Sequence, residues 1–249
     1  MTFMTNSPHE ATQKLNNTWP KTIPQLSQEQ LVAREKWMKL WHELLPNKYG
    51  MVENFNHGFP AKLFQPQSGR KPRTLEVGAG LGEHVKWEDT SAQEYSMLEY
   101  RQEWTEQLKS KYPQYHCFQG DIQSELPFPP HSFERIIAIH VLEHLPDLPR
   151  ALGEINRLLT PGGSFETVIP CEGGWAYEIA REMTSARLFR KNFGMDYRPI
   201  MKAEHINRCD EILAELTRMP WNQRKRSYFP LLIPVWHANF CIGLQFRKL

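Results

Sequence analysis

The chain has 249 residues, a formal net charge of +2 at pH 7, 40% hydrophobic residues and 23% charged residues. These proportions are ordinary for a globular domain, and the weak net charge excludes a strong field for nucleic acid or anionic lipid. The four cysteines are far apart and form no C-x-x-C pair, which disfavours a structural zinc site or a disulfide framework. Because neither a signal-peptide pattern nor an apolar stretch of bilayer length is evident, we expect a cytoplasmic protein with no membrane partner.

Composition divides the N-terminal part of the chain in two. Residues 1–26 are rich in Asn, Thr, Gln and Pro, and we expect them to form a flexible N-terminal arm. Residues 27–70 are expected to be a helical extension, because a capping-box pattern at Ser27 precedes apolar residues at helical spacing up to Pro46. We expect this helix to pack on the edge of a sheet. The segment 54–60 is expected to be a polar-aromatic loop, which could cover a cofactor site.

Residues 71–249 alternate strand and helix patterns, which predicts an α/β domain with a mostly parallel sheet and helices on both faces. The strands of this alternation are predicted at 73–77, 94–98, 115–119, 133–139 and 164–169. Helices are predicted at 101–111, 147–159 and 208–216. Two final strands, 225–229 and 239–246, have no helix between them and indicate an antiparallel pair at one edge. The alternation breaks at 171–203, which we interpret as an inserted substrate cap rich in aromatic residues and arginine.

Three glycines at alternate positions follow the first predicted strand: Gly78, Gly80 and Gly82. Glycines so spaced allow a sharp turn and let a ligand approach main-chain N–H groups. A dinucleotide site needs a further glycine where this chain has Glu83, and a carboxylate there would repel a pyrophosphate. Glu76, before the loop, instead suits a cationic ligand without phosphate, such as S-adenosylmethionine, although it could merely cap a turn.

Polar side chains recur at the ends of the next three strands, where open α/β sheets bind ligands. Glu99 ends the second strand, and its carboxylate can accept both hydroxyls of a ribose. Asp121 follows the third strand and can accept an adenine amino group, with Ile122 against the ring, although Asp121 could also be a helix N-cap. His140 follows the fourth strand.

Together these residues resemble the class I S-adenosylmethionine-dependent methyltransferases, particularly the group akin to ubiquinone- and menaquinone-biosynthesis methylases. The motifs that carry the resemblance are Glu76-x-Gly78-x-Gly80-x-Gly82, Glu99, Gly120-Asp121-Ile122, His140-Val-Leu-Glu-His144 and Leu159-x-Pro161-Gly162-Gly163. The resemblance implies a Rossmann-like, seven-stranded sheet with a reversed last strand, and S-adenosylmethionine as cofactor. The cofactor-binding residues so predicted are Glu76, Gly78, Ala79, Gly80, Gly82, Glu99, Tyr100, Asp121, Ile122 and His140.

The cluster after the fourth strand, His140-x-x-Glu143-His144, supplies the candidate catalytic residues His140 and His144. Imidazole titrates near neutral pH, so either could remove a proton from a methyl acceptor, and His140 is the better candidate. Some related methylases bind a metal with Glu-x-x-Glu-His at this place. Here His140 replaces the first Glu, which disfavours magnesium coordination, and His205 would be a distant further ligand. We therefore predict no metal site, although metal binding by this cluster stays open.

The predicted function is methyl transfer to a hydroxyl-bearing small molecule, with O-methylation favoured. Candidate acceptor-binding residues are Trp175, Tyr177, Arg190 and His205, although the aromatic residues could equally form a core of the cap. One alternative is an RNA or tRNA methyltransferase, supported by the basic run 224–226 but opposed by the low net charge. Others are an inactive methyltransferase fold used as an interaction subunit and a nicotinamide oxidoreductase. We do not expect a nucleic-acid partner, and no oligomeric state is predicted.

Overall fold

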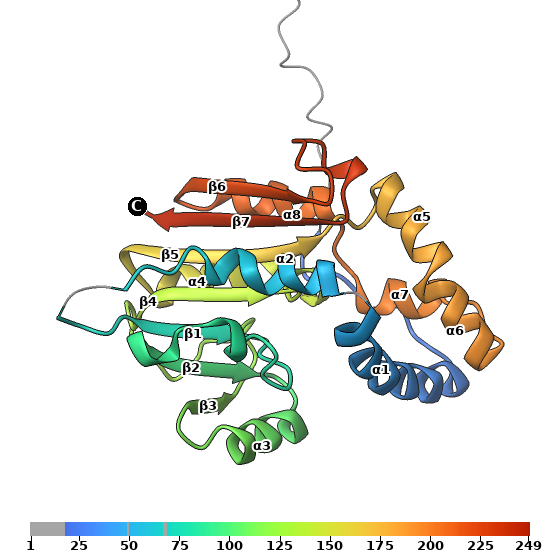
Figure 1. Cartoon of the computed structure of the whole chain (residues 1–249), viewed down its shortest axis with the longest axis horizontal. Coiled ribbons are helices and arrows are strands. Elements are labelled where there is room, and N and C mark those ends of the chain that lie inside the picture. Colours follow the sequence, from blue (N-terminus) through green and yellow to red (C-terminus); the bar gives the residue numbers. More distant parts are fainter. Residues whose placement is uncertain (1–17, 49, 67–68) are drawn as a thin grey trace, which may run out of the picture.

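The computed structural model describes residues 18–48, 50–66 and 69–249, with the backbone alone for 41–48 (Figure 1). One sheet of seven strands forms its centre, in the order β3-β2-β1-β4-β5-β7-β6. The strands are β1 (Arg73–Val77), β2 (Glu94–Glu99), β3 (His116–Gln119), β4 (Phe133–Ile139), β5 (Leu159–Pro170), β6 (Trp221–Phe229) and β7 (Cys241–Lys248). The first five are parallel, and β7 is antiparallel to both of its neighbours. The predicted fold class, including the reversed last strand, is confirmed.

The central strands are buried on both faces, and each face has its own apolar cluster. Ile136 and Ala138 of β4 pack toward α4 (Leu148–Leu158) and α8 (Cys209–Arg218), whereas Ile137 packs on the opposite face. This alternation follows from the period of two along a strand. Figure 1 shows α4 and α8 behind the sheet and α3 (Gln102–Lys111) beside β2 and β3.

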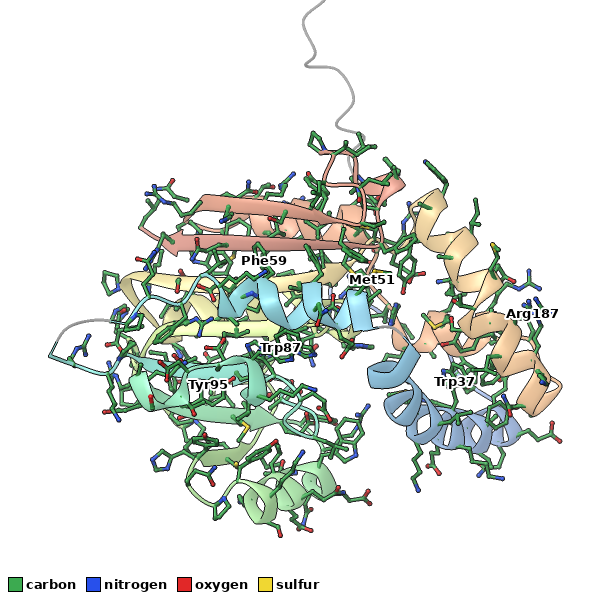
Figure 2. All side chains as sticks on the ribbon, in the orientation of Figure 1. Trp37, Met51, Phe59, Trp87, Tyr95 and Arg187 are labelled. Carbon is green, nitrogen blue, oxygen red and sulfur yellow. The ribbon has the colours of Figure 1, made fainter. Side chains whose placement is uncertain are left out.

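The opposite face is covered by a helix from the N-terminal extension rather than by one that follows β1. The link from β1 to β2 holds only two short 3₁₀ helices, η1 (Val85–Trp87) and η2 (Thr90–Ala92). Helix α2 (Gly50–Ala61) lies across this face, so the prediction of a loop at 54–60 is wrong (Figure 1). The segment is helical because packing overrides its poor local propensity: Phe59 lies on Gly243, where an added Cβ would be 2.6 Å from the ring (Figure 2).

Helix α1 (Gln28–Lys48) packs on the inserted segment, so the prediction that it lies on the sheet edge is wrong, and it extends two residues past Pro46. Trp37 of α1 contacts Phe189 and Tyr197, with ring centroids 5.5 Å apart in both pairs (Figure 2). The inserted segment itself folds into three helices, α5 (Trp175–Met183), α6 (Ser185–Phe193) and α7 (Arg198–Glu204). Together α1, α5, α6 and α7 form a helical cap at the carboxyl ends of the parallel strands (Figure 1).

The described part of the predicted N-terminal arm, residues 18–26, contacts the body of the protein, whereas residues 1–17 lie outside the described residues. Lys21 donates from Nζ to the carboxylate of Glu211 at 2.7 Å and from its backbone to the carbonyl of Pro146 at 2.9 Å. All four cysteines are buried free thiols. Within the described ranges, none of the helices has the length and apolar character required to cross a membrane.

Candidate functional site

The glycine loop after β1 adopts a backbone that only glycine accepts easily. Gly78, Gly80 and Gly82 have φ angles of 68°, 58° and 80°, in the left-handed region. A Cβ on Gly78 would be 2.5 Å from a methyl group of Val141, and one on Gly82 would be 2.4 Å from the Tyr112 ring. The loop therefore fits closely between the segment after β4 on one side and α3 on the other.

The N–H groups of the loop are bound within the protein. Those of Gly78 and Ala79 donate to the carbonyl of Leu98 at 2.8 and 3.1 Å, and that of Gly82 donates to the carbonyl of Ala79 at 2.9 Å. Gly80 N–H donates to Glu99 at 3.0 Å, and the next N–H donates to the Glu83 carboxylate at 3.2 Å. A pyrophosphate would need free N–H donors and a helix N-terminus, and this loop offers carboxylates and no following α-helix. The nicotinamide alternative is therefore disfavoured by geometry as well as by spacing.

Glu99 links the end of β2 to this loop. One oxygen of its buried carboxylate accepts from Gly80 and the other accepts from the N–H of Arg101 at 2.9 Å. The neighbouring Tyr100 is 69% exposed, so its ring is free to contact a bound molecule. The ring of Trp104 lies near Gly80, because an added Cβ there would be 3.8 Å away. The predicted cofactor residues on β1 and β2 are thus in one place.

Asp121 and Ile122 lie where expected, just beyond β3. The Asp121 carboxylate accepts from the backbone N–H of Gln123 at 2.9 Å and caps a turn, since no α-helix follows. The predicted alternative of a helix N-cap therefore does not apply, although a local capping role does. Ile122 is only 4% exposed and packs in the main core.

Glu76 is buried, on the face of the sheet that α2 covers. Tyr95 donates its hydroxyl to the Glu76 carboxyl at 2.8 Å. Burial and the nearby Glu88 and Glu83 outweigh the effects of that hydrogen bond and of Arg135, and raise the pKa of Glu76 to about 8. Glu76 is therefore a neutral hydrogen-bonding group at neutral pH unless a cation comes close to it.

Helix α2 brings titratable residues that sequence reasoning did not assign to the site. His57 Nε2 lies 3.3 Å from Glu53, and its Nδ1 lies 3.3 Å from Nδ1 of His84. Burial opposes ionisation of Glu53, but His57 and the charge of His140 hold the pKa of Glu53 below its usual value. Glu53 thus lies close enough to His140 to affect it. The sequence signal was weak, because nothing in the pattern of 50–61 distinguishes a site helix from a loop.

A buried ionic network lies beneath α2. Arg135 of β4 pairs with Glu88 at 2.6 Å and with Glu166 of β5 at 2.7 Å, and His84 contacts Glu88 at 2.9 Å. Despite burial, hydrogen bonds from His84 and Arg135 hold the pKa of Glu88 at about 2. An arginine inside the apolar run of the fourth strand was a signal for such a network, because a buried guanidinium requires acidic partners.

His140 follows β4 directly and has a φ of 52°, which is unusual for a residue with a side chain. Its Nδ1 lies 3.1 Å from Oε1 of Glu143, and 32% of its side chain is exposed. Burial disfavours the charged imidazole, but the hydrogen bond and charge of Glu143 prevail and raise the pKa of His140. Glu143 thus holds the imidazole ring of His140 through Nδ1, and part of the ring remains exposed.

Glu143 is fully buried yet ionised. Burial alone would raise its pKa, but His140, His144 and His205 lower the pKa of Glu143 to about 2. His205 comes from the residue after α7 and lies beside His144, with ring centroids 5.0 Å apart. The structure thus brings together four predicted or discussed residues from η3 (Leu142–His144), the end of β4 and the cap.

The other predicted acceptor residues are more dispersed. Tyr177 packs against the main core, whereas Trp175 is 60% exposed. Arg190 pairs with Glu182 at 2.9 Å beside an open hollow of about 650 Å³ on α6 and α7. The charged side chains of this hollow pair with one another, so it is a poor candidate for the reaction site. Phe193 packs against the apolar core of the cap.

Comparison with known proteins agrees with this geometry. A family profile described as "Methyltransferase domain" matches residues 75–167, which carry the glycine loop, Glu99 and His140. A "Probable S-adenosylmethionine-dependent methyltransferase" of Mycolicibacterium smegmatis is 30% identical over 96 residues, 39% of this chain and 37% of that protein. A 2-phytyl-1,4-naphtoquinone methyltransferase of Thermosynechococcus vestitus is 42% identical over 57 residues, 23% of this chain and 25% of that protein. The chain thus matches well under half the length of these curated relatives.

Among solved structures, a SAM-dependent methyltransferase from Aquifex aeolicus has the same fold, with a TM-score of 0.58 and 13% identity. That match covers 87% of this chain and 98% of the other. The strand order, the glycine loop and the domain match agree, and the names of the Mycolicibacterium relative and of the Aquifex structure both include S-adenosylmethionine as methyl donor. Residues 75–167 are therefore similar to a methyltransferase domain, and the fold is that of a solved S-adenosylmethionine-dependent methyltransferase.

Proposed function

We propose that this protein transfers a methyl group from S-adenosylmethionine to a hydroxyl of a small-molecule metabolite. The observation that carries this proposal is the contact between His140 Nδ1 and Glu143 Oε1 after β4, at 3.1 Å. The His140 side chain remains partly exposed, so an acceptor can reach it. It lies in the same domain as the glycine loop and Glu99, at the carboxyl ends of parallel strands. A base beside the cofactor end of the sheet suits an acceptor that must lose a proton.

The cofactor residues are proposed from position and chemistry. Glu99 has two oxygens at the loop, each with one N–H donor, and a carboxylate oxygen has room for a second hydrogen bond from a ribose hydroxyl. Asp121 and Ile122 are assigned to the adenine, and Glu76 to the ammonium of the methionine part. Gly80 leaves room for close approach of the ligand to the backbone, because an added Cβ there would meet nothing nearer than Glu83 at 3.5 Å.

His140 is proposed as the general base. A sulfonium supplies a methyl group by in-line displacement, so the protein has to align the acceptor oxygen and take its proton. With Nδ1 directed to Glu143, the other ring nitrogen, Nε2, is left for the acceptor hydroxyl. The proton passes from that hydroxyl to Nε2, and Glu143 holds the imidazole in orientation and stabilises its positive charge.

The cap is proposed to bind the acceptor, with the segment 171–203 as its main part. It lies over the carboxyl ends of the strands, and α1 supports it from the N-terminal extension (Figure 1). Of the predicted acceptor residues, His205 contacts His144 of the Glu143 cluster, and Tyr177 packs on the main core. A relative named for a naphthoquinone supports a ring-bearing acceptor.

Incubation of the protein with methyl-labelled S-adenosylmethionine and a metabolite extract, followed by mass spectrometry, tests the proposal. We expect one low-molecular-weight product that carries the label on oxygen, and its loss when His140→Ala replaces the wild type. Label on carbon or nitrogen would exclude O-methylation. Failure to bind S-adenosylmethionine in calorimetry would favour the alternative of an inactive interaction subunit.

A nucleic-acid substrate has one observation in its favour, the exposed basic run 224–226 on β6. This strand is at the edge of the sheet, where charged side chains prevent pairing with another chain, so the run has a structural explanation. Label transfer to tRNA, with binding that weakens steeply as salt increases, would support this alternative.

A further inference from the structure

Helix α5 turns an apolar side to solvent and an ionic side to the protein. Trp175, Ile179 and Met183 are four residues apart, so they lie on one side of the helix, and they are 60%, 54% and 70% exposed. The other side of the helix holds Arg181, which is largely buried and pairs with Glu172. A surface helix normally has the reverse arrangement, with its apolar side toward the core. The exposed side of α5 therefore suits an apolar contact outside the chain.

The loop 230–240 between β6 and β7 presents aliphatic side chains from a fixed backbone. Four of them are between 44% and 77% exposed: Leu231, Leu232, Ile233 and Val235. Asn239 is fully buried, and its side-chain oxygen accepts from the N–H of Leu231 at 2.9 Å. Its side-chain nitrogen donates to the carbonyls of Ile233 and Val235 at 3.1 and 2.8 Å. These bonds hold the loop from inside, so the exposure of its aliphatic side chains is a feature of the fold.

The two segments form one surface, which we call the apolar patch: the three side chains of α5 and the four of the loop. A Cβ added to Gly174, just before α5, would lie 3.0 Å from Cα of His237, in η4 (Trp236–Ala238) near the end of the loop. Figure 1 shows the loop and the start of α5 side by side at one corner of the molecule. Seven of the twelve large apolar side chains exposed in the described residues belong to this patch, so they are gathered rather than scattered. Gathered apolar surface of this kind marks an interaction site.

The strand that leads into the patch is basic, with no acidic residue to balance it. Residues 219–249 contain five lysines and arginines and no aspartate or glutamate, although the whole chain has a net charge of only +2. Arg224, Lys225 and Arg226 are exposed on β6, and none of them pairs with a carboxylate in the part of the chain that the structure describes. Protection of an edge strand requires charge but not charge of one sign alone. An anionic partner accounts for the sign.

We propose that the apolar patch and the basic run of β6 bind the surface of a bilayer that contains anionic phospholipids. Apolar side chains enter the boundary between headgroups and acyl chains, tryptophan favours that boundary, and lysine and arginine are attracted to anionic headgroups. The corner formed by α5, the loop and β6 offers all three (Figure 1). A second copy of this chain fits less well, because a symmetric contact would bring two basic strands of the same sign together.

The protein would lie on the bilayer and not cross it. The expectation of no membrane partner was based on the lack of an apolar stretch of bilayer length, which does not bear on binding at the surface. Because α5 is the first helix of the inserted segment, this orientation places the helical cap against the lipid. Binding to lipid requires neither cofactor nor acceptor, so lipid binding and methyl transfer are tested separately.

Flotation of the full-length protein with lipid vesicles tests the proposal. We expect binding to vesicles of equimolar phosphatidylcholine and phosphatidylglycerol, and at least ~10-fold weaker binding to phosphatidylcholine alone. Binding to the mixed vesicles should weaken as the salt concentration rises, because salt screens the attraction between exposed charges. Absence of binding to the mixed vesicles at low salt would overturn the proposal.

Variants locate the contact. Leu232→Glu should lower the affinity for the mixed vesicles by about 10- to 100-fold, because an apolar side chain no longer enters the lipid. Met51→Glu is the matched control, because Met51 is also 77% exposed but lies on α2, and it should bind as the wild type does (Figure 2). Arg224→Gln combined with Lys225→Gln should lower the affinity by about 10- to 30-fold and reduce its dependence on salt. Equal affinity in Leu232→Glu and Met51→Glu would overturn the assignment to the patch.

The oligomeric state tests a second copy as the occupant. All the substituted side chains are exposed, so thermal unfolding should give each variant nearly the Tm of the wild type. Analytical ultracentrifugation without vesicles should show the same species for the wild type and for Leu232→Glu. If the wild type is a dimer that Leu232→Glu dissociates, and the wild type binds no vesicles, a second copy covers the patch and the proposal is overturned.

Discussion

Glu76 and Glu143 are two buried carboxylates at the carboxyl end of the same sheet, and their surroundings give them opposite charge states. Burial, with smaller effects of the nearby Glu88 and Glu83, outweighs the hydrogen bond from Tyr95 and raises the pKa of Glu76 to about 8. Glu143 lies among three histidines, and its pKa is about 2. Burial is nearly complete for both, with 4% and 0% exposed. Burial raises the pKa of both carboxyl groups, and the difference in charge arises because only Glu143 has three histidines that overcome this effect.

The two carboxylates mark two halves of the site that are built differently. The proposed cofactor half is made mainly by residues 76–99, in which the loop after β1 meets Glu99 at the end of β2. The other half joins η3, α2 and the cap, which are far apart in the chain. Under the proposed function, Glu76 of the first half would ionise when the cationic ligand binds, whereas Glu143 of the second half is already ionised.

The largest expected effect is the loss of cofactor binding when the glycine loop is changed, which tests the cofactor half alone. Gly80→Arg should abolish measurable binding of S-adenosylmethionine, because a side chain is strained at φ 58° and would occupy the space beside the backbone. Calorimetry measures the affinity, and thermal unfolding shows whether the protein is folded. Gly162→Arg is the control, because it has a similar φ of 73° but open space around it. Unchanged affinity in Gly80→Arg would remove the cofactor half from the proposal.

The second prediction concerns the other half. His140→Ala should lower kcat by about 10²- to 10⁴-fold, the usual contribution of a general base, with little change in cofactor affinity. Steady-state kinetics with the identified acceptor measures it, and added imidazole should restore part of the activity. His116→Ala, on exposed β3, should behave as the wild type. A full loss that imidazole does not rescue would show that His140 has a structural role.

The cofactor half could be predicted from the sequence because its signals are local. Strands 73–77 and 133–139 coincide with β1 and β4, and the three glycines have the left-handed φ angles that their spacing suggested. The position of Glu99 near the loop followed from chain order, because the next strand in the chain, β2, pairs directly with β1 and ends at Glu99. Each inference needed only the period of a strand and the geometry of one turn.

The other half could not be predicted because its residues meet through packing. Trp37 holds α1 against α6 because its ring packs on Phe189, which is far from it in the sequence. The 54–60 segment has a glycine and a proline that suggest a loop, yet burial against the sheet makes it helical. His205 was named as a distant ligand, but only the fold of α7 brings it to His144. The residues of this half could be named from the sequence, but their contacts depend on packing between distant segments.

The third prediction tests whether the cofactor reaches Glu76. If the ammonium lies beside this carboxyl, binding must ionise it, so affinity should rise up to tenfold per unit of pH below about 8. The window is about pH 5.5 to 7.5, below the range of ~7.7–8.0 in which α-amino groups titrate. Around Glu76 the charged and titratable groups are Tyr95, Glu88, Glu83 and Arg135.

Calorimetry in buffers of different ionisation enthalpy should detect one proton released per cofactor bound by the wild type in that window. Glu76→Gln keeps a side chain of the same shape that does not titrate, so its affinity should be nearly independent of pH and no proton should be released. A flat profile in the wild type would show that the ammonium binds elsewhere and that Glu76 has a structural role at the end of β1.

The smallest expected effect concerns one hydrogen bond that holds the glycine loop of the cofactor half. Tyr112 donates its hydroxyl to the carbonyl of Gly82 at 3.1 Å, and Tyr112→Phe removes one hydrogen bond worth about 1 kcal/mol, or roughly fivefold in cofactor affinity. Tyr115→Phe is the matched control, because its hydroxyl contacts Thr90 at 2.7 Å and leaves the loop untouched. We expect both variants to lose similar free energy of unfolding and only Tyr112→Phe to bind more weakly. If both bind equally well, the hydrogen bond stabilises the fold without fixing the conformation that binds the cofactor.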